Sequence, residues 1–407
     1  MLLPPVGDDG DTSDVRRSVI DLEQLHRIPL HRAYRSQNEE AYVLDALRSG
    51  TTQGDGPYTE RCHRLLRQIM GTRHVLLTTS GTTALEMGAL LARRSLPGEP
   101  AGEVICPAYT FMSSAGAFLL HGYRPVFADV REDTLNLDEA HVEALIGPQT
   151  RAIVAVHYAG VPAAMDRLRA LADRHDVTLI EDAAHAIGAS FQGRPVGSLG
   201  DMAAFSFHAT KNVSCGEGGA VTVNRPELVA RSEYIRDKGT NREEFRRGKV
   251  PRYGWVDIGG SYLPSDILAA HLLAQLEDRG KIQRLRKARF QSYMDGLAPL
   301  EQAGLLRLPR VPDDVEPSYH LFHVLVEDEA TRDALSESLR LADIAAYFHY
   351  PALHLTREGR RYGPAEGSLP VAEAAASRLL RLPLYPDLDP FDLERVVDAI
   401  GHYFRRR

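Results

Sequence analysis

The sequence predicts an α/β fold in which helices cover both faces of a mostly parallel sheet, followed by a smaller α+β unit. Strand-length apolar runs alternate with amphipathic segments along most of the first 223 residues. These runs are rich in Val and Ile and do not alternate strictly in polarity, which is typical of strands buried on both faces. A chain of 407 residues is also long enough to form two domains.

The elements of the large unit follow in order. Helical spacing over 39–49 precedes a turn-rich loop, and a second helix is expected over 58–70. Strands are expected at 74–78, 103–106, 125–128, 152–156, 177–181, 202–207 and 220–223, with helices at 82–94, 113–121, 138–145 and 163–175. In such sheets ligands bind at the carboxyl ends of the strands, so the residues that follow the strands are the candidates for a site.

The rest of the chain predicts a long loop and a second domain. Residues 238–262 lack periodicity, and helical patterns resume over 265–291. A compact β-α-β unit is expected from 319–326, 330–340 and 344–348, with a closing helix over 391–404. We therefore divide the chain into a flexible tail (1–25), a large cofactor-binding α/β domain (26–275) and a small C-terminal α+β domain (276–407).

Composition argues against several classes of partner and site. The net charge is −7, without a long basic run, so neither nucleic acid nor an anionic membrane is expected as a partner. No apolar stretch is long enough to span a bilayer. The three cysteines are far apart and lack metal-ligand spacing, so we expect no metal site and a reducing, cytoplasmic setting.

Lys211 is the first candidate for chemistry. It follows the apolar run 202–207 and is the first of only five lysines among 48 basic residues. Where arginine carries nearly all the positive charge, a lysine in this position indicates a need for an amine that can lose its proton and form a Schiff base with an aldehyde cofactor. The alternative is an ordinary lysine that reaches into solvent after a strand.

Ser80, Gly81 and Thr82 join a strand to a helix and are candidates for binding phosphate. Free N–H groups and the positive end of the helix dipole favour an anion there, and glycine permits close approach. Ser206, in the strand before Lys211, can donate to the same phosphate. The alternative for Ser80 is a simple N-cap.

Two further residues follow strands. Asp182 ends a fully apolar strand, where an unpaired carboxylate is costly, and a protonated pyridine nitrogen is a fitting partner; an Asp that caps the next turn is the alternative. Tyr109 can lie flat on an aromatic ring, or it can be a plain core residue. A phosphate cup, a stacking aromatic, an Asp for the ring nitrogen and a Schiff-base lysine together predict a site for pyridoxal 5'-phosphate (PLP).

Six segments in the same order resemble the sugar aminotransferases of the DegT/DnrJ/EryC1/StrS family. The resemblance runs from about residue 34 to the C-terminus and is carried by segments 80–85, 107–111, 181–185, 205–212, 216–220 and 381–384. It implies the fold type I PLP-dependent transferase architecture, which is that of aspartate aminotransferase. Some members of the family are dehydratases with histidine at the lysine position, and Lys211 therefore favours transamination.

The resemblance also implies a role for individual residues. Lys211 would hold the cofactor covalently, Asp182 would bind its ring nitrogen, and His185 would lie by its phenolic oxygen. Ser80, Gly81, Thr82 and Ser206 would bind its phosphate. Asn224 would reach the phosphate of a neighbouring subunit, which implies a homodimer with two shared active sites.

Within the family, segments 157–160, 235–242, 260–263 and 348–351 resemble the nucleotide-sugar C4-aminotransferase of enterobacterial common-antigen synthesis (dTDP-4-amino-4,6-dideoxygalactose transaminase type). This implies conversion of dTDP-4-keto-6-deoxyglucose to a dTDP-4-amino-4,6-dideoxyhexose, with L-glutamate as donor. Amination of a 3-keto sugar is the alternative. Lys238, Asn241, His349 and Tyr350 would border the sugar nucleotide. The bias toward arginine is typical of a GC-rich genome and fits an antibiotic-sugar pathway such as that of an enediyne.

Two other classes of function are weighed against this one. A nicotinamide-dependent oxidoreductase should carry Gly-x-Gly-x-x-Gly after an early strand, and the pattern is missing. A non-catalytic regulator of the same fold should have lost Lys211 or Asp182, and both are present. The sequence leaves open whether the new amine is equatorial or axial.

Overall fold

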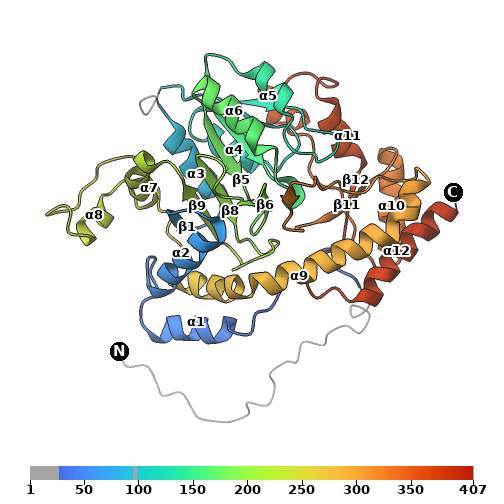
Figure 1. The fold of residues 1–407 in the computed structure, drawn as a ribbon, viewed down its shortest axis with the longest axis horizontal. Coiled ribbons are helices and arrows are strands. Elements are labelled where there is room, and N and C mark those ends of the chain that lie inside the picture. Colours follow the sequence, from blue (N-terminus) through green and yellow to red (C-terminus); the bar gives the residue numbers. More distant parts are fainter. Residues whose placement is uncertain (1–26, 95–98, 407) are drawn as a thin grey trace, which may run out of the picture.

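The computed structural model describes residues 27–94 and 99–406, and the predicted tail (1–25) lies outside them. A seven-stranded sheet at the centre has the order β1-β9-β8-β5-β4-β2-β3 (Figure 1). All seven segments predicted as strands form it. Only β9 is antiparallel to its neighbours β1 and β8, so the sheet is mostly parallel. Its strands are β1 (Val75–Thr78), β2 (Gly102–Pro107), β3 (Tyr123–Ala128), β4 (Thr150–Val156), β5 (Thr178–Asp182), β8 (Met202–Ser206) and β9 (Gly219–Val223).

Each face of this sheet is covered by its own hydrophobic core, because successive side chains of a strand point to opposite faces. Ile153 packs on one face, whereas Val154, the next residue of β4, packs on the other. Leu66, Leu168 and Leu272, from three helices, belong to the core with Ile153. Burial on both faces explains why the strands carry continuous apolar runs.

The helices predicted for the large unit all form, with boundaries that differ by a few residues. They are α1 (Glu39–Arg48), α2 (Pro57–Met70), α3 (Gly81–Ala92), α4 (Ser113–Leu119), α5 (Glu139–Leu145) and α6 (Met165–His175). A further helix, α7 (Val229–Arg236), follows β9 and was not predicted. A small sheet of β6 (Ser190–Phe191), β7 (Arg194–Pro195) and β10 (Val315–Glu316) lies outside the central sheet.

One long helix, α9 (Asp266–Gln302), runs from the large unit to the small one (Figure 1). Leu272 and Ile282 pack on the large sheet, whereas Phe290 and Leu297 belong to a third core. The predicted boundary at residue 275 therefore lies inside a continuous helix, and the division into two domains stays a prediction. The third core lies among α9, α10 (Glu329–Leu341), α12 (Pro390–Arg405), β11 (Phe322–Leu325) and β12 (Leu379–Leu382), next to α11 (Pro370–Arg378).

The β-α-β prediction for the small unit is wrong in its last strand. Segment 344–348 forms only isolated bridges, from Ile344 to Ile28 and from Tyr347 to Arg381. The neighbour of β11 is β12, which lies more than 50 residues later and pairs with it antiparallel. A pairing between segments so far apart leaves no local signal in the sequence.

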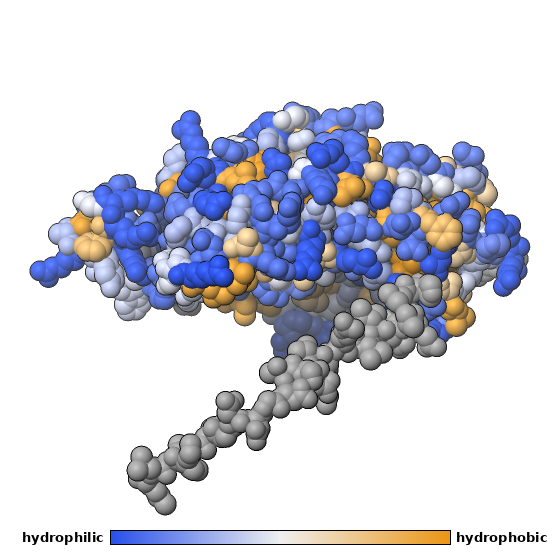
Figure 2. Space-filling view, turned by 90° about the horizontal axis from the view of Figure 1, so that it is seen from below, coloured by the Kyte–Doolittle hydropathy of each residue, from blue (hydrophilic) through white to orange (hydrophobic). Residues whose placement is uncertain are grey.

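Residues 238–260 form an arm that projects from the large unit and carries α8 (Arg242–Arg246) (Figure 1). An isolated bridge between Thr240 and Trp255 holds its two limbs together. Hydrophobic atoms are visible on the arm, at the left end of the molecule in Figure 2. Across the described residues, no helix has both the length and the apolar character needed to cross a membrane.

Candidate active site

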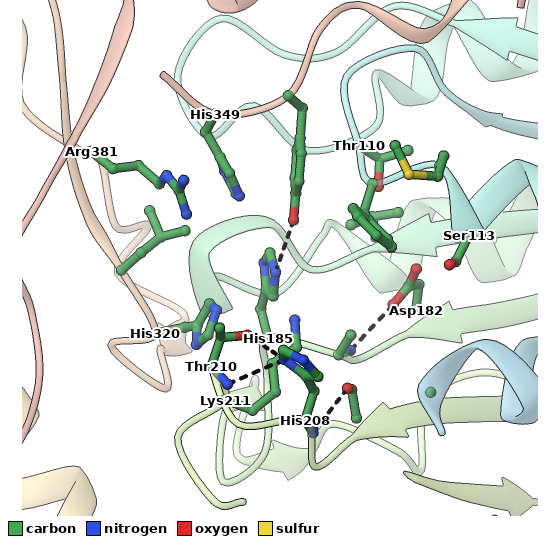
Figure 3. A pocket seen from close by; sticks show the side chains of 18 of the residues that line it. Thr110, Ser113, Asp182, His185, His208, Thr210, Lys211, His320, His349 and Arg381 are labelled. Atoms are coloured by element: carbon green, nitrogen blue, oxygen red, sulfur yellow. Dashed lines mark hydrogen bonds between the residues drawn. The ribbon is translucent and has the colours of Figure 1, made fainter. Parts of the chain in front are cut away.

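A cavity of about 620 Å³ opens at the carboxyl ends of the central strands (Figure 3). Its walls combine strand ends of the large unit with residues from 320–321, 347–351 and 381–384 of the small unit. Nine of the residues that the sequence singled out line it together: Ser80, Gly81, Thr82, Asp182, His185, Ser206, Lys211, His349 and Tyr350.

The predicted phosphate cup lies at the start of α3. Ser80 caps this helix, and its side chain accepts a hydrogen bond from the Thr83 N–H at 3.1 Å. Gly81 is pressed against β8, since a Cβ at this position would lie only 2.8 Å from the Ser206 Cβ. Close packing therefore brings the helix N-terminus and the Ser206 hydroxyl together, and both can donate to an anion.

Asp182 ends β5 and is only 7% exposed. One carboxylate oxygen accepts a hydrogen bond from the Ser114 hydroxyl at 2.7 Å, and the other accepts one from the Ala184 N–H at 3.2 Å. These contacts fix the carboxylate at the cavity wall. No cation forms an ion pair with it within the described part of the chain, so it is free to bind a protonated ring nitrogen.

Lys211 lies five residues after the end of β8, on the turn that follows the strand. Desolvation of its amine lowers the pKa of Lys211 to about 8; Asp182 opposes this shift and Arg381 adds to it. Near neutral pH an amine with this pKa is still mostly protonated, but its neutral fraction is far larger than that of an ordinary lysine, and only the neutral form is nucleophilic.

Histidines form one wall of the cavity. The rings of His185 and His320 stack with centroids 4.2 Å apart, and Nε2 of His185 lies 3.3 Å from the Tyr350 hydroxyl. Burial lowers the pKa of both histidines well below the usual value, so they are neutral at pH 7. Nδ1 of His185 is buried and has no hydrogen-bond partner in the described structure, which leaves it available for a ligand.

The position of Tyr109 contradicts its predicted role as the stacking aromatic. Its side chain is fully buried outside the cavity, and its hydroxyl donates to the carbonyl oxygen of His349 at 2.6 Å. Tyr109 therefore supports the cavity wall from behind. Phe111, two residues later, lines the cavity and is 47% exposed, which makes it the aromatic that can stack on a ring.

The position of Asn224 contradicts its predicted role at a neighbouring subunit's phosphate. Its amide donates to the carbonyl oxygens of Gly197 and Gly200, both at 2.9 Å, and its oxygen accepts from Thr72 at 2.6 Å. Both amide protons are used, so no donor remains for a phosphate. Asn224 instead ties together loops at the opposite end of the sheet.

Lys238 and Asn241 do not line the cavity of the single chain. Lys238 lies at the base of the arm and pairs with Asp237 at 2.7 Å. The Asn241 side-chain oxygen accepts from the Gly254 N–H at 2.8 Å, which joins the two limbs of the arm.

Three side chains of this site carry no sequence signal that marks them as functional. Ser114 holds Asp182, His320 stacks on His185, and Arg381 lines the cavity beside them. Segment 381–384 belonged to the family resemblance, but nothing local marks an arginine in a strand of the small unit as a cavity residue.

The cavity residues fit PLP. Nδ1 of His185, which has no hydrogen-bond partner in the described structure, can bind the phenolic oxygen of the cofactor. The close approach at Gly81 places the helix N-terminus where it can bind the phosphate. The carboxylate of Asp182, which has no cationic partner in the described structure, can bind the ring nitrogen. Lys211 supplies an amine with a lowered pKa.

Comparisons with known proteins agree with this fit. The chain matches the model of the DegT/DnrJ/EryC1/StrS aminotransferase family over residues 34–401. It is similar to S. venezuelae DesV (34% identity, 94% of this chain and 99% of that chain covered, TM-score 0.81). It is similar to the sugar aminotransferase CalS13 from Micromonospora echinospora (28% identity, 92% of this chain and 99% of that chain covered, TM-score 0.83). It is also similar to the PLP form of Spr1654 from Streptococcus pneumoniae (27% identity, 93% of this chain and 99% of that chain covered, TM-score 0.84). The pyridoxamine phosphate (PMP) form of that protein matches as well. The predicted fold class and the cofactor are thereby confirmed.

Lys211→Ala should abolish covalent capture of PLP, because no other lysine lines the cavity among the residues that the structure describes. Borohydride reduction followed by peptide mapping should place the cofactor on Lys211 in the wild type. In the apo-protein, capture should speed up as the pH rises through about 8 and level off above that value, because the neutral amine is the nucleophile. Lys238→Ala is the matched control and should capture PLP normally; a label on any other lysine would contradict the assignment.

Asp182→Asn should still bind PLP but lose most of its turnover, because a neutral amide cannot keep the ring nitrogen protonated. Steady-state kcat and cofactor titration test this separately. Ser114→Ala removes one hydrogen bond to the carboxylate and should have a much smaller effect. If kcat of Asp182→Asn fell by less than about tenfold, or ~1.4 kcal/mol of barrier, Asp182 would be a structural cap.

Proposed function

Because this chain belongs to the DegT/DnrJ/EryC1/StrS aminotransferase family and is a PLP-dependent sugar aminotransferase, we propose that it aminates C4 of dTDP-4-keto-6-deoxyglucose. The product is a dTDP-4-amino-4,6-dideoxyhexose, and L-glutamate is the amino donor. The reaction belongs to deoxyaminosugar biosynthesis in the cytoplasm, in a pathway for an antibiotic sugar such as that of an enediyne.

The observation that carries the C4 assignment is the position of segment 348–351. This segment resembles the C4-aminotransferase branch of the family, and all four of its residues line the cavity. The rings of His349 and Tyr350 stack with centroids 3.5 Å apart, and the Tyr158 hydroxyl lies 2.8 Å from Nδ1 of His349. A ring held in this way presents a fixed surface to a sugar. The chemistry on the cofactor is the same for a 3-keto and a 4-keto sugar, so the way the sugar is held must select the carbon.

Individual residues divide the work of the reaction. PLP, when bound, takes the amine from the donor and passes it to the ketone of the sugar. Lys211 can move protons at its Nζ near neutral pH, because its pKa is close to the working pH. The helix N-terminus at Ser80 and Gly81 anchors the cofactor, and Asp182 fixes its ring.

The homodimer with shared active sites is supported by the arm. Four large hydrophobic residues of the arm are exposed in the single chain: Phe245 (44%), Tyr253 (57%), Trp255 (82%) and Val256 (52%). Such a cluster is typical of a surface that a partner covers. A second copy would bury it and bring Lys238 and Asn241 to the sugar nucleotide of its partner. A local cation such as Lys238 is needed, since a net charge of −7 does not attract a diphosphate from a distance.

Incubation with dTDP-4-keto-6-deoxyglucose and L-glutamate should yield an amine at C4, read by NMR of the purified product. Coupling constants then give the gluco or galacto configuration. Lys211→Ala is the control for uncatalysed exchange and should give no product. Turnover only with the 3-keto isomer would replace the proposal with C3 amination.

Trp255 reports on the dimer directly, because it is the only tryptophan of the chain. Its emission should be blue-shifted at micromolar protein, as for a buried indole, and should shift to the red on dilution as the dimer dissociates. Trp255→Ser should lower the mass measured by light scattering toward that of one 45.0 kDa chain. A wild-type monomer with red-shifted emission at every concentration would contradict the proposal.

A further inference from the structure

Arg381 is the one cation besides Lys211 among the described residues that line the cavity. It lies on β12 between Leu380 and Leu382, which both pack in the third core, so its side chain leaves the strand on the opposite face. Figure 3 shows the guanidinium pointing toward the imidazoles of His320 and His349.

The guanidinium of Arg381 has unused hydrogen-bond donors. Its Nη2 donates to the carbonyl oxygen of Phe348 at 3.3 Å, and its Nε is buried without any partner in the described structure. No carboxylate of the described chain forms an ion pair with it. Many other arginines of the described chain do have such a partner, as Arg340 has with Glu337. A shielded donor without an acceptor is costly, so this position calls for a ligand that is absent from the chain itself.

The surroundings of Arg381 leave its charge uncompensated. Burial, first of all, lowers the pKa of His320 and of His349, so both imidazoles are neutral at pH 7. The acids that line the cavity have other contacts, since Asp182 accepts from Ser114 and Glu217 lies 3.6 Å from His208. A fork of N–H groups with a full positive charge matches a carboxylate better than any neutral group does.

We propose that Arg381 binds the α-carboxylate of the amino-acid donor. This assignment rests on the proposed function in that the enzyme takes its amine from an amino acid. The amine of the donor must come to the place that Lys211 serves, and its carboxylate is only one carbon away. Arg381 is near enough to Lys211 to lower the pKa of that amine. The diphosphate of a sugar nucleotide, by contrast, is separated from the reacting carbon by the sugar ring.

The test measures binding without turnover. 2-Methyl-L-glutamate has no α-hydrogen, so it can bind but cannot transfer its amine, and its dissociation constant follows from the change in cofactor absorbance. Arg381→Gln should raise this constant by about 10- to 100-fold, the range for a lost hydrogen-bonded charge pair. Arg381→Lys should recover only part of the affinity, because an ammonium cannot bind bidentately. Arg340→Gln, an exposed position on α10, removes the same charge elsewhere and should change nothing.

Two further ligands identify the bound group. The α-amide of the probe, 2-methyl-isoglutamine, should bind with nearly the same affinity to wild type and to Arg381→Gln, because the variant removes a contact that the amide does not make. Thymidine diphosphate should also bind equally to both. If Arg381→Gln weakened thymidine diphosphate binding but left the dissociation constant of the amino acid unchanged, Arg381 would be assigned to the nucleotide instead. If the variant lost equal affinity for the probe and for its amide, the contact between Arg381 and the α-carboxylate would be overturned.

Thermal unfolding of each variant checks that β12 still pairs through its backbone, as it does between Arg381 and Tyr347. No sugar is present in these measurements. If the enzyme failed to aminate C4, the comparison of dissociation constants for 2-methyl-L-glutamate would therefore still be valid. If these constants were equal in wild type and Arg381→Gln, only the role of Arg381 would be overturned.

Discussion

The site depends on the register of four strands in the central sheet. Asp182 on β5 is aligned with Ala204 on β8, and Ser206 on β8 is aligned with Gly219 on β9. Gly219 in turn faces Thr78 on β1, and a Cβ at Gly219 would lie 2.3 Å from the Ser80 carbonyl carbon. The absence of that side chain lets α3 start against the sheet. A slip of one residue would turn every side chain to the other face and separate the carboxylate from the phosphate cup.

The second half of the site depends on α9. Arg286 is buried in this helix and donates to the carbonyl oxygens of Tyr319 (2.8 Å), His320 and Leu384 (3.2 Å). Desolvation lowers the pKa of Arg286 to about 9, so at neutral pH the guanidinium stays charged. Its bonds fix the segments that carry His320 and the end of β12. Because α9 also packs on the large sheet, one helix sets the distance between the two walls of the cavity.

The sequence was sufficient to predict those features for which the local pattern agrees with the global fold. The seven strands were predictable because burial on both faces gives continuous apolar runs. Lys211 and Asp182 were predictable as site residues because a charged group directly after such a run is costly unless it has a partner or a function. Prediction failed where the backbone is irregular or the partner is distant. Tyr109 and Phe111 lie in a loop without a period, so nothing in the sequence says which aromatic faces the cavity. The end of β9 gave no sign that Asn224 turns back into the protein, and the pairing of β12 with β11 has no local trace.

Charge in the cavity is concentrated on very few groups. Burial is the largest cause that lowers the pKa of four lining histidines, His31, His185, His320 and His349, so none of them adds charge at neutral pH. Neutral imidazoles can be buried at low cost, whereas charged ones would repel Lys211 and Arg381. Anions in the cavity must therefore be bound by those two cations, by hydroxyl groups such as that of Ser206 and by free backbone N–H groups. In a chain of net charge −7 this arrangement makes anion binding short-range, so its specificity comes from the position of each donor.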